Sequence, residues 1–471
     1  MFHVVIVGAG LSGLSIAYRL RCAAPMLKIT ILEKENQIGG NIRTVERAGF
    51  RVETGPNGFL DAKPSTVQLC QDLGLQQHLL AASEGSRKNR YLFWNGRLRK
   101  LPSSFWSFVT NDILSWRGKL GLYFEKYRRG RQNIDEDESI YDFARRRAGR
   151  EVAAILADAM VTGIHGGDAR LLSVRAAFPR LVGFEQNYGS VMRGFTAAAR
   201  ERRQASNARG EKAQPVRMWS FREGLGRLIA GLKEHCQADV VTGVKVRSIR
   251  RDDRWTVSGE GADRWQADSV VLTSQGPEQA SQLAEIDAPL AEIIASIAYA
   301  TITVVALGFL RRHVPKLYDG FGYIAPQALK RDILGVQWCS EIFPDRAPEG
   351  CLLYRSLCGG WHRPDIISWD EERLIRAVRD ELHLAQGITD PPVFTEIKKW
   401  PNAIPQYTLG HLQKVAQIEK RLSDHPGLFL GGNLYHGVAM NDCTERATIV
   451  ANSILDYLRT QSPRHEFLRQ G

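Results

Sequence analysis

Short apolar runs alternate with a helical pattern over the first 33 residues of the chain. Val4–Val7 is a run of four apolar, β-branched residues, and Lys28–Leu32 carries a second such run. The stretch between them, through Leu20, has the apolar spacing of a helix. A short continuous apolar run is typical of a strand buried on both faces. The pattern therefore predicts a strand–helix–strand unit at the head of an α/β fold.

Three glycines follow the first run at the spacing G-x-G-x-x-G, namely Gly8, Gly10 and Gly13. The first permits a tight turn, the second lets a pyrophosphate approach the backbone, and the third lets helix and strand pack closely. Glu33 ends the second strand, where a carboxylate can accept hydrogen bonds from a ribose hydroxyl. This order of elements predicts a dinucleotide site. The alternative is a glycine-rich turn without function, and Glu33 argues against it.

The residues after Lys34 select the kind of dinucleotide. The pair Gly39-Gly40 is followed by Arg43 and then by the turn Gly55-Pro56. A nicotinamide dehydrogenase normally continues into another βαβ unit. Here a glycine pair, a cation and a tight turn can bring backbone and positive charge against a flavin and its phosphates. The sequence therefore predicts FAD.

A hairpin pattern follows the predicted nucleotide site. Tyr91–Trp94 and Arg97–Leu101 are joined by Asn95-Gly96, the dipeptide that type I′ turns prefer. Arg90 stands at the start of this hairpin, where a fixed guanidinium can pair bidentately with a carboxylate. The alternative is a solvated surface arginine.

Aromatic and basic residues are mixed along the segment 102–131. This composition is typical of a segment that lies among lipid headgroups. A core-facing amphipathic helix with cations at its C-terminus is an equal alternative.

Further on, the segment 160–168 is predicted to be a helix broken by glycines, in which His165 is either a base or, more simply, a structural donor. The charged stretch 200–215 is expected to be a mobile excursion.

The second half of the chain returns to strand patterns. Runs at 240–246, 255–257 and 267–273 are expected to rejoin the nucleotide-binding domain, with an independent αβ domain as the alternative. The 18 uncharged residues 293–310 have the length of a membrane span, but their second half alternates like a strand. Near the end, Gly431-Gly432-Asn433 and a helix opened by Gly437 recreate the anion-friendly start of the first helix.

Composition adds limits to these expectations. The chain has 471 residues, enough for two or three domains, and a formal net charge of +12. No nucleic-acid motif accompanies this charge, so anionic lipid surfaces and carboxylate-bearing substrates are the preferred partners, with a basic soluble surface as the alternative. Seven cysteines without C-x-x-C spacing are expected to be reduced core residues, and the histidines predict no metal site. With a strand predicted from His3 or Val4, we expect a cytoplasmic protein without a leader.

Several of these segments resemble the oxygen-dependent, FAD-containing protoporphyrinogen oxidase family, within the amine oxidase and phytoene desaturase superfamily. The resemblance covers nearly the whole chain and is carried by the glycine motifs and by Asn89-Arg90-Tyr91, Leu172–Leu181, Phe343–Pro348 and Gly431–Val438. It implies a p-hydroxybenzoate-hydroxylase-like architecture of three parts. These are a Rossmann-type FAD-binding domain (1–85, 215–283 and 425–471), a mixed α+β substrate domain (86–98 and 284–424) and a helical, membrane-associating domain (99–214).

The resemblance also implies site residues. Contacts to FAD fall on Gly8, Gly10, Gly13, Glu33, Lys34, Gly40, Arg43, Gly55, Pro56, Val244, Trp400, Gly432 and Val438. Arg90 matches an arginine that faces a tetrapyrrole propionate, and Gly163 matches a glycine whose carbonyl faces the pyrrole nitrogens. Leu357 stands where relatives carry an aromatic residue against a ring face, which leaves the shape of that wall open.

The implied reaction is oxidation of protoporphyrinogen to protoporphyrin in haem biosynthesis. A hydride passes from a meso carbon to the flavin, and molecular oxygen then gives hydrogen peroxide. No catalytic side chain is predicted, because the cofactor carries the chemistry. The implied partners are the tetrapyrrole, oxygen and the cytoplasmic face of a membrane, with a homodimer and ferrochelatase as further candidates. The rival readings are a coproporphyrinogen III oxidase, an amine oxidase or carotenoid desaturase, and a non-catalytic tetrapyrrole-binding flavoprotein.

Overall fold

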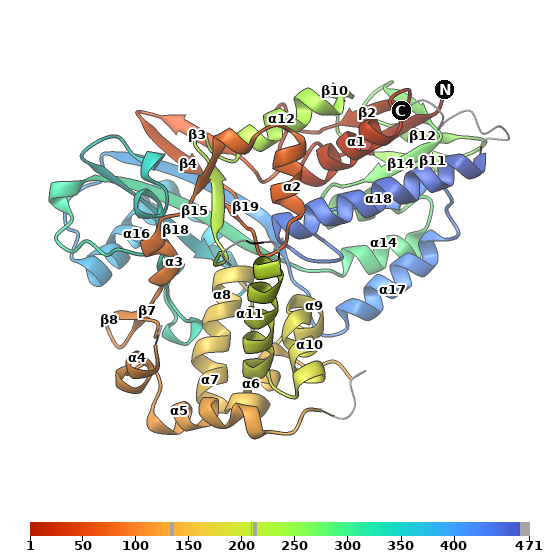
Figure 1. Ribbon diagram of the computed structural model, residues 1–471. Helices are drawn as coiled ribbons and strands as arrows, with labels where there is room; N and C mark the ends of the chain where they lie inside the picture. Colours follow the sequence, from red (N-terminus) through yellow and green to blue (C-terminus); the bar gives the residue numbers. More distant parts are fainter. Residues whose placement is uncertain (103, 132–135, 209, 211–213, 462–471) are drawn as a thin grey trace.

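The computed structural model describes the 471-residue chain except for residues 103, 132–135, 209, 211–213 and 462–471 (Figure 1). A parallel sheet of five strands in the order β10-β2-β1-β14-β20 organises its upper part in this view. The strands are β1 (His3–Val7), β2 (Lys28–Leu32), β10 (Asp239–Val241), β14 (Ser269–Leu272) and β20 (Leu428–Leu430). The predicted strand–helix–strand unit is thus confirmed, and strands distant in sequence join it.

Both faces of this sheet are covered. Ile6 and Val4 point toward helices α1 (Leu11–Ala23), α2 (Ser65–Asp72), α12 (Gly226–Cys236) and α18 (Met440–Gln461). The opposite face packs against an antiparallel meander and three helices: β11 (Ser248–Arg251), β12 (Trp255–Ser258), β13 (Arg264–Ala267), α13 (Gly276–Leu283), α14 (Ala288–Ala295) and α17 (His411–Leu422). Burial on both sides explains why β1 carries only apolar side chains between His3 and the glycines.

A second, mixed sheet has seven strands in the order β19-β15-β18-β17-β16-β7-β8. Their bounds are β7 (Tyr91–Trp94), β8 (Arg97–Lys100), β15 (Tyr299–Leu310), β16 (Gly322–Ile324), β17 (Ile333–Trp338), β18 (Cys351–Gly359) and β19 (Phe394–Pro405). Asn95 and Gly96 have φ of 50° and 75°, as the predicted type I′ turn requires. The uncharged run 293–310 is the end of α14, a turn and β15, as expected. Helix α16 (Glu371–Gln386) covers one face of this sheet.

Short sheets connect these two layers. β3 (Thr44–Arg47) pairs with β4 (Phe50–Glu53), while β5 (Phe59–Leu60) and β6 (Leu79–Ala81) flank β9 (Met218–Phe221). Helix α3 (Glu84–Lys88) leads into β7.

A helical layer lies below the seven-stranded sheet in Figure 1. It consists of α4 (Phe105–Thr110), α5 (Trp116–Tyr123), η2 (Phe124–Tyr127), α6 (Ile140–Ala148), α7 (Arg150–Val152), η3 (Ala153–Ala157), α8 (Asp158–His165), α9 (Val174–Ala177), α10 (Pro179–Tyr188) and α11 (Val191–Ala208). Within the described residues, no helix is long and apolar enough to cross a membrane.

Two expectations were wrong. Residues 200–208 are not an excursion: they form the last turns of α11, because their charged side chains suit an exposed helix as well as a loop. Of the seven cysteines, Cys22 is exposed near the end of α1, so it is no core residue.

Candidate functional site

The turn between β1 and α1 is built from close glycine contacts. Gly8 has φ of +107°, and a Cβ at Gly13 would lie 2.0 Å from the Gly8 carbonyl oxygen. Gly10 is the N-cap of α1 and has no side chain to cap it, and the first turn of the helix carries no acidic residue. The first amides of α1 therefore remain available to an anion, which fits the pyrophosphate of a dinucleotide.

Glu33 lies beside this turn, buried at 7% exposure. Its carboxylate accepts hydrogen bonds from the backbone N–H of Ala9 at 2.8 Å and of Glu35 at 3.0 Å. The Val244 N–H donates to the Glu33 carbonyl at 2.9 Å, so both residues share one edge of the sheet. Lys34, by contrast, is exposed and forms an ion pair with Glu278.

The second glycine group closes onto the first. A Cβ at Gly40 would lie 3.3 Å from the Gly10 Cα, and Gly39 forms a bridge with Gly10. Arg43 Nε donates to the Gly40 carbonyl at 3.1 Å. A Cβ at Gly55 would lie 1.7 Å from the Asn41 carbonyl oxygen, so only glycine fits there.

Trp400 connects this group to the seven-stranded sheet. Its indole Nε1 donates to the Thr54 carbonyl at 2.6 Å, and the Arg43 guanidinium lies 5.8 Å from its ring centroid. Trp400 and Leu357 both pack against one apolar cluster, whose buried members are Ile302, Val304 and Leu334. The residues predicted for the flavin and for one wall of the substrate site thus meet here.

The segment Gly431–Val438 lies beside the first glycine turn. Gly432 has φ of +106° and lies near Thr273, whose hydroxyl donates to the Gly8 carbonyl at 3.0 Å. Tyr407 spans the following loop: its hydroxyl donates to the Asn433 carbonyl at 2.5 Å and accepts from the Gly437 N–H at 2.8 Å. The helix after this loop, α18, begins at Met440 and not at Gly437, because Gly437 has φ of +107°.

One row of paired residues runs across the seven-stranded sheet from Leu357 through Gly335 and Ile324 to Leu92. Arg90 precedes Leu92 by two positions and therefore points to the same face of the sheet. With about 4.8 Å between neighbouring strands, β18 and β7 lie roughly 14 Å apart. A ligand that contacts both Arg90 and Leu357 is therefore much larger than a simple amine.

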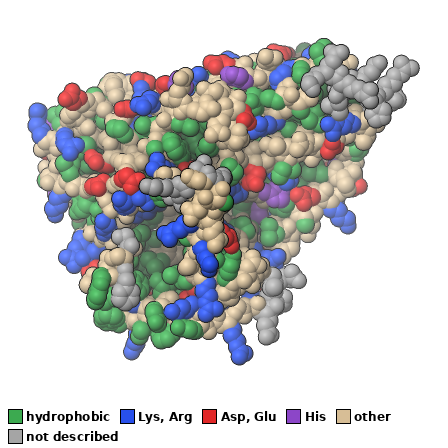
Figure 2. Space-filling view, viewed as in Figure 1, with side chains coloured by type: hydrophobic (Ala, Val, Ile, Leu, Met, Phe, Trp, Pro, Cys, Tyr) green, Lys and Arg blue, Asp and Glu red, His purple; other side chains and the backbone are tan. Residues whose placement is uncertain are grey.

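The Arg90 side chain is available to a ligand. It is exposed, and its guanidinium lies 4.8 Å from the Phe321 ring centroid. Among the described residues it has no carboxylate within ion-pair distance and no hydrogen-bond acceptor. Desolvation by the surrounding protein lowers the pKa of the guanidinium. On the face of the molecule drawn in Figure 2, a hollow has hydrophobic side chains inside and Lys and Arg along its rim.

Helix α8 faces the same row. Gly163 lies within the helix rather than breaking it, and a Cβ there would lie 2.6 Å from Ile324 Cδ1. His165 is 1% exposed, and burial lowers its pKa to about 4, so the ring is neutral. It packs edge-on against Phe178 with 5.4 Å between centroids. These facts favour the structural role of His165 over that of a base.

Three buried residues of this region escaped the sequence prediction. Arg346, in the Phe343–Pro348 motif, is fully buried; it donates to Ser220 Oγ at 2.8 Å and lies 3.9 Å from the Glu53 carboxylate. Arg355 and Tyr407 are likewise buried. The signal for Arg355 was visible, since it interrupts the apolar run 351–358.

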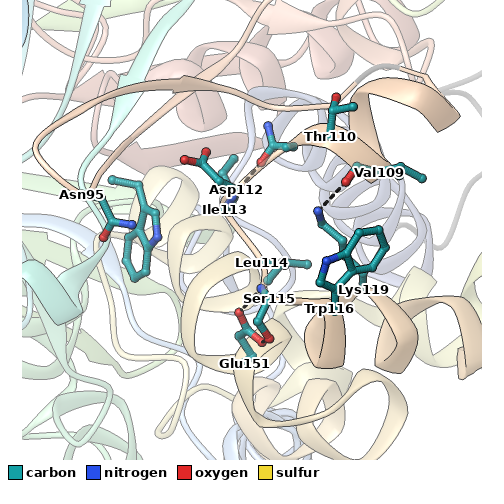
Figure 3. Close-up of a pocket in the computed structure, with 12 residues that line it drawn as sticks. Asn95, Val109, Thr110, Asp112, Ile113, Leu114, Ser115, Trp116, Lys119 and Glu151 are labelled. Atoms are coloured by element: carbon teal, nitrogen blue, oxygen red, sulfur yellow. Dashed lines mark hydrogen bonds between the residues drawn. The ribbon is translucent and has the colours of Figure 1, made fainter.

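A separate hollow of about 770 Å³ lies in the helical layer (Figure 3). Its walls come from the tip of the β7–β8 hairpin, the segment 109–115, α5 and Glu151. The polar groups that line it are paired: Lys119 Nζ donates to the Val109 carbonyl at 2.6 Å, and Glu151 accepts from Ser115. None of the predicted site residues lines this hollow, so it is distinct from the predicted cofactor and substrate sites.

The chain belongs to the flavin-containing amine oxidoreductases, whose family model matches residues 11–455. The predicted FAD-dependent oxidoreductase is thereby confirmed, and the glycine turn, Glu33 and the uncapped α1 fit the cofactor.

Within that class, the chain is similar to protoporphyrinogen oxidases. It is 31% identical to the chloroplastic protoporphyrinogen oxidase of Nicotiana tabacum over 96% of this chain and 85% of that protein. It is 30% identical to the human protoporphyrinogen oxidase, over 96% and 98%, and 28% identical to the coproporphyrinogen III oxidase of Bacillus subtilis, over 97% and 98%. The crystal structure of a putative protoporphyrinogen oxidase from Exiguobacterium shares the fold, with a TM-score of 0.83 at 24% identity over 97% of this chain and 99% of that chain. These findings confirm the predicted resemblance and the α/β flavoprotein fold.

Proposed function

We propose that the protein oxidises protoporphyrinogen IX to protoporphyrin IX, with FAD as cofactor and molecular oxygen as acceptor. The observation that carries this proposal is Arg90, a cation with no ion-pair partner among the described residues, on the sheet face that also bears Leu357. A tetrapyrrole with propionate groups suits this arrangement, because it is wide and anionic. The full-length similarity to plant and human protoporphyrinogen oxidases supports the same substrate.

In this proposal the protein binds FAD and the tetrapyrrole and orients them relative to one another. The residues that would hold FAD are those of the glycine turns, Glu33, Arg43, the Gly55-Pro56 turn, Trp400 and the 432–438 return. Bound FAD supplies a hydride acceptor for a meso carbon of the macrocycle. Arg90 fixes one propionate by charge-assisted hydrogen bonds, and Leu357 forms an apolar wall. No side chain is required as a base, in agreement with the neutral, buried His165.

A coproporphyrinogen III oxidase is the second candidate. It is favoured by the similarity to two bacterial coproporphyrinogen III oxidases, from Bacillus subtilis and Staphylococcus aureus, at 28% and 27% identity. Parallel assays decide between the two: porphyrin fluorescence and oxygen consumption are followed with protoporphyrinogen and with coproporphyrinogen. We expect the higher kcat/KM with protoporphyrinogen; inertness toward both refutes both functions.

The role of Arg90 has its own test. Arg90→Ala should raise KM for the tetrapyrrole about tenfold or more, since a charge-assisted bidentate pair stabilises by about 1.5–3 kcal/mol. The content of bound FAD should not change. The matched control is Arg97→Ala on the same hairpin, because Arg97 is exposed and pairs with Asp112. Equal kinetics for the Arg90 variant and the native protein contradict the assignment.

We further propose the three-domain, p-hydroxybenzoate-hydroxylase-like organisation, with the helical part 99–214 resting on an anionic membrane surface. Hydrophobic side chains gather over α4 and α5 with cations beside them (Figure 2). Trp106, Trp116, Tyr123 and Tyr127 are all more than half exposed there. Flotation with vesicles of phosphatidylcholine and phosphatidylglycerol tests this proposal, and a protein that stays at the bottom of the gradient contradicts it. Cytoplasmic location, a homodimer and ferrochelatase remain predictions.

A further inference from the structure

Arg355 is a buried cation in an unusual environment. It lies in the middle of β18, two positions before Leu357, and is 4% exposed. A guanidinium keeps its proton under all ordinary conditions, so burial does not remove the charge. Burying an ion without a counter-ion costs several kcal/mol per charge. A buried guanidinium is therefore expected to have a negatively charged group near it.

The hydrogen-bond partners of Arg355 are neutral, and the Glu53 carboxylate acts on its charge only from beyond ion-pair distance. Nη1 donates to the Gln337 side-chain oxygen on β17 at 2.7 Å, and Nη2 donates to the Gly55 carbonyl. Nε is buried and has no partner. In the described part of the chain, no carboxylate lies within 4.0 Å of this guanidinium.

Arg346 shows what a compensated cation looks like in the same region. It is also fully buried, but the Glu53 carboxylate lies 3.9 Å from its Nη2. Burial raises the pKa of Glu53, while hydrogen bonds from the Leu225 N–H and Thr44, together with Arg346, act in the opposite direction. One carboxylate therefore faces two buried guanidinium groups, and an excess of positive charge remains behind the Gly55 turn.

That turn belongs to the predicted flavin site. The Thr54 carbonyl accepts from Trp400 and the neighbouring Gly55 carbonyl accepts from Arg355, so two strands of the seven-stranded sheet hold successive peptide groups of the turn. On its other side the turn packs against backbone, since a Cβ at Gly55 would lie 1.7 Å from the Asn41 carbonyl oxygen. Arg355 is thus fixed against the backbone that approaches the cofactor.

We propose that Arg355 is a positioning residue whose uncompensated charge favours the reduced flavin. Reduction of FAD by two electrons and one proton leaves one net negative charge on the ring system. A fixed cation in a low-dielectric surrounding stabilises that charge, directly and through the polarised Gly55 peptide. Arg355 would thereby offset part of the negative charge that bound FAD gains on reduction. The inference rests on the proposed function, since it needs FAD at the Gly55-Pro56 turn.

The midpoint potential of bound FAD tests this inference. Full-length protein is loaded with FAD, and its reduction is measured by equilibration with a reference dye. Arg355→Met should lower the equilibrium constant for two-electron reduction at least tenfold, which is about 30 mV toward more negative potential. Arg355→Lys keeps the charge and should stay within threefold of the native protein.

The matched control is Arg331→Met. Arg331 is paired with Glu381 of α16 at 2.8 Å, so its charge is already compensated and its removal should leave the potential unchanged. If Arg355→Met does not fold, Arg355→Gln is decisive, because it is neutral and retains hydrogen-bond donors. The inference is overturned if Arg355→Met or Arg355→Gln binds FAD and keeps the native potential, or if Arg331→Met shifts the potential by the same amount. Either result leaves the proposed function untouched. A native protein that does not retain FAD refutes the proposed function before any potential is measured.

Discussion

The five-stranded sheet and the helical layer bury different kinds of side chain. All five residues of β1 are buried, and the clusters on both faces of that sheet are apolar. In the helical layer, Glu125 and Arg147 are each 2% exposed and paired with one another. Glu125 also accepts from Ser190 Oγ at 2.6 Å and from the Val191 N–H at 3.0 Å, while Arg147 Nη1 donates to Glu185 at 3.1 Å.

The two regions differ in the kind of interaction that stabilises them. Apolar burial is non-directional and grows with area, so the sheet depends on many small contributions. A buried ion pair stabilises little in itself, but breaking it exposes an unpaired charge to a low dielectric. In addition to the apolar cluster around Ile140 and Phe143, a few directional contacts join the helices η2, α6, α10 and α11. Single substitutions should therefore lower stability by small steps in the five-stranded sheet and by one large step at the buried ion pair of the helical layer.

The largest effect is expected for Arg147→Ala. Leaving Glu125 and Glu185 buried without their partner should cost about 4 kcal/mol of stability. Urea denaturation measures the loss, and hydrogen exchange should locate it in the helical layer. Arg145→Ala is the control, because Arg145 forms only an exposed pair with Asp142 and should cost less than about 0.5 kcal/mol. Equal losses for the two variants would erase the contrast.

A truncation in the apolar core beside the five-stranded sheet should destabilise only that region. Leu14 on α1 is fully buried, so Leu14→Ala should cost about 3 kcal/mol through lost transfer energy and a cavity. We expect weaker retention of FAD and faster exchange around the five-stranded sheet, with exchange in α6 and α11 unchanged. Increased exchange throughout the helical layer would show that the regions are not separable.

His165 gives the helical layer a pH dependence. Burial lowers its pKa from 6.5 to about 4, so between these values the unfolded chain binds more protons than the folded one. Stability therefore falls as pH decreases through this window, by about 2 kcal/mol at pH 5. The difference between native protein and His165→Asn measures this contribution separately from that of His411, whose pKa burial also lowers to about 4. Parallel stability profiles for both proteins contradict the assignment.

The smallest effect on stability is expected at the aromatic surface. Trp116→Ser and Tyr127→Ser should change unfolding free energy by no more than about 0.5 kcal/mol, because both side chains are exposed. Recovery with anionic vesicles should nevertheless fall about tenfold for the double variant. Met26→Ser, at an exposed apolar residue beside the five-stranded sheet, is the control and should float like the native protein. Unaltered flotation of the double variant removes the membrane role of this surface.

Local patterns predicted local structure well. The glycine turn and the Asn95-Gly96 turn are determined within a few residues, and the structure confirms them; β2 ends at Leu32, one residue before the predicted end at Glu33. The helix at 200–208 was missed because its charged composition also suits a loop. The domain boundaries and the individual cofactor contacts remain predictions.

Residues that act across the chain were the hardest to foresee. Arg147 meets a glutamate 22 positions away, and Arg355 meets a glycine 300 positions away. Tyr407 combines several distant contacts, since its carbonyl accepts from Ser173 N–H while its hydroxyl holds the 433–437 loop. Such roles depend on tertiary packing, which periodicity and motif spacing do not contain.

The strand order of the five-stranded sheet has a consequence for synthesis of the protein. β1 pairs with β14, and the His3 N–H donates to Asp268, 265 residues later; β20 then adds to β14. At translation rates of roughly 5–20 residues per second, β1 waits on the order of tens of seconds for its neighbour. During that time the nascent chain exposes the four apolar residues of this strand and the glycine turn that follows them, before the β14 segment is available to cover them. The ribosome therefore releases a polypeptide whose first segment is among the last to be completed, and early chaperone contact should concentrate on Val4–Val7.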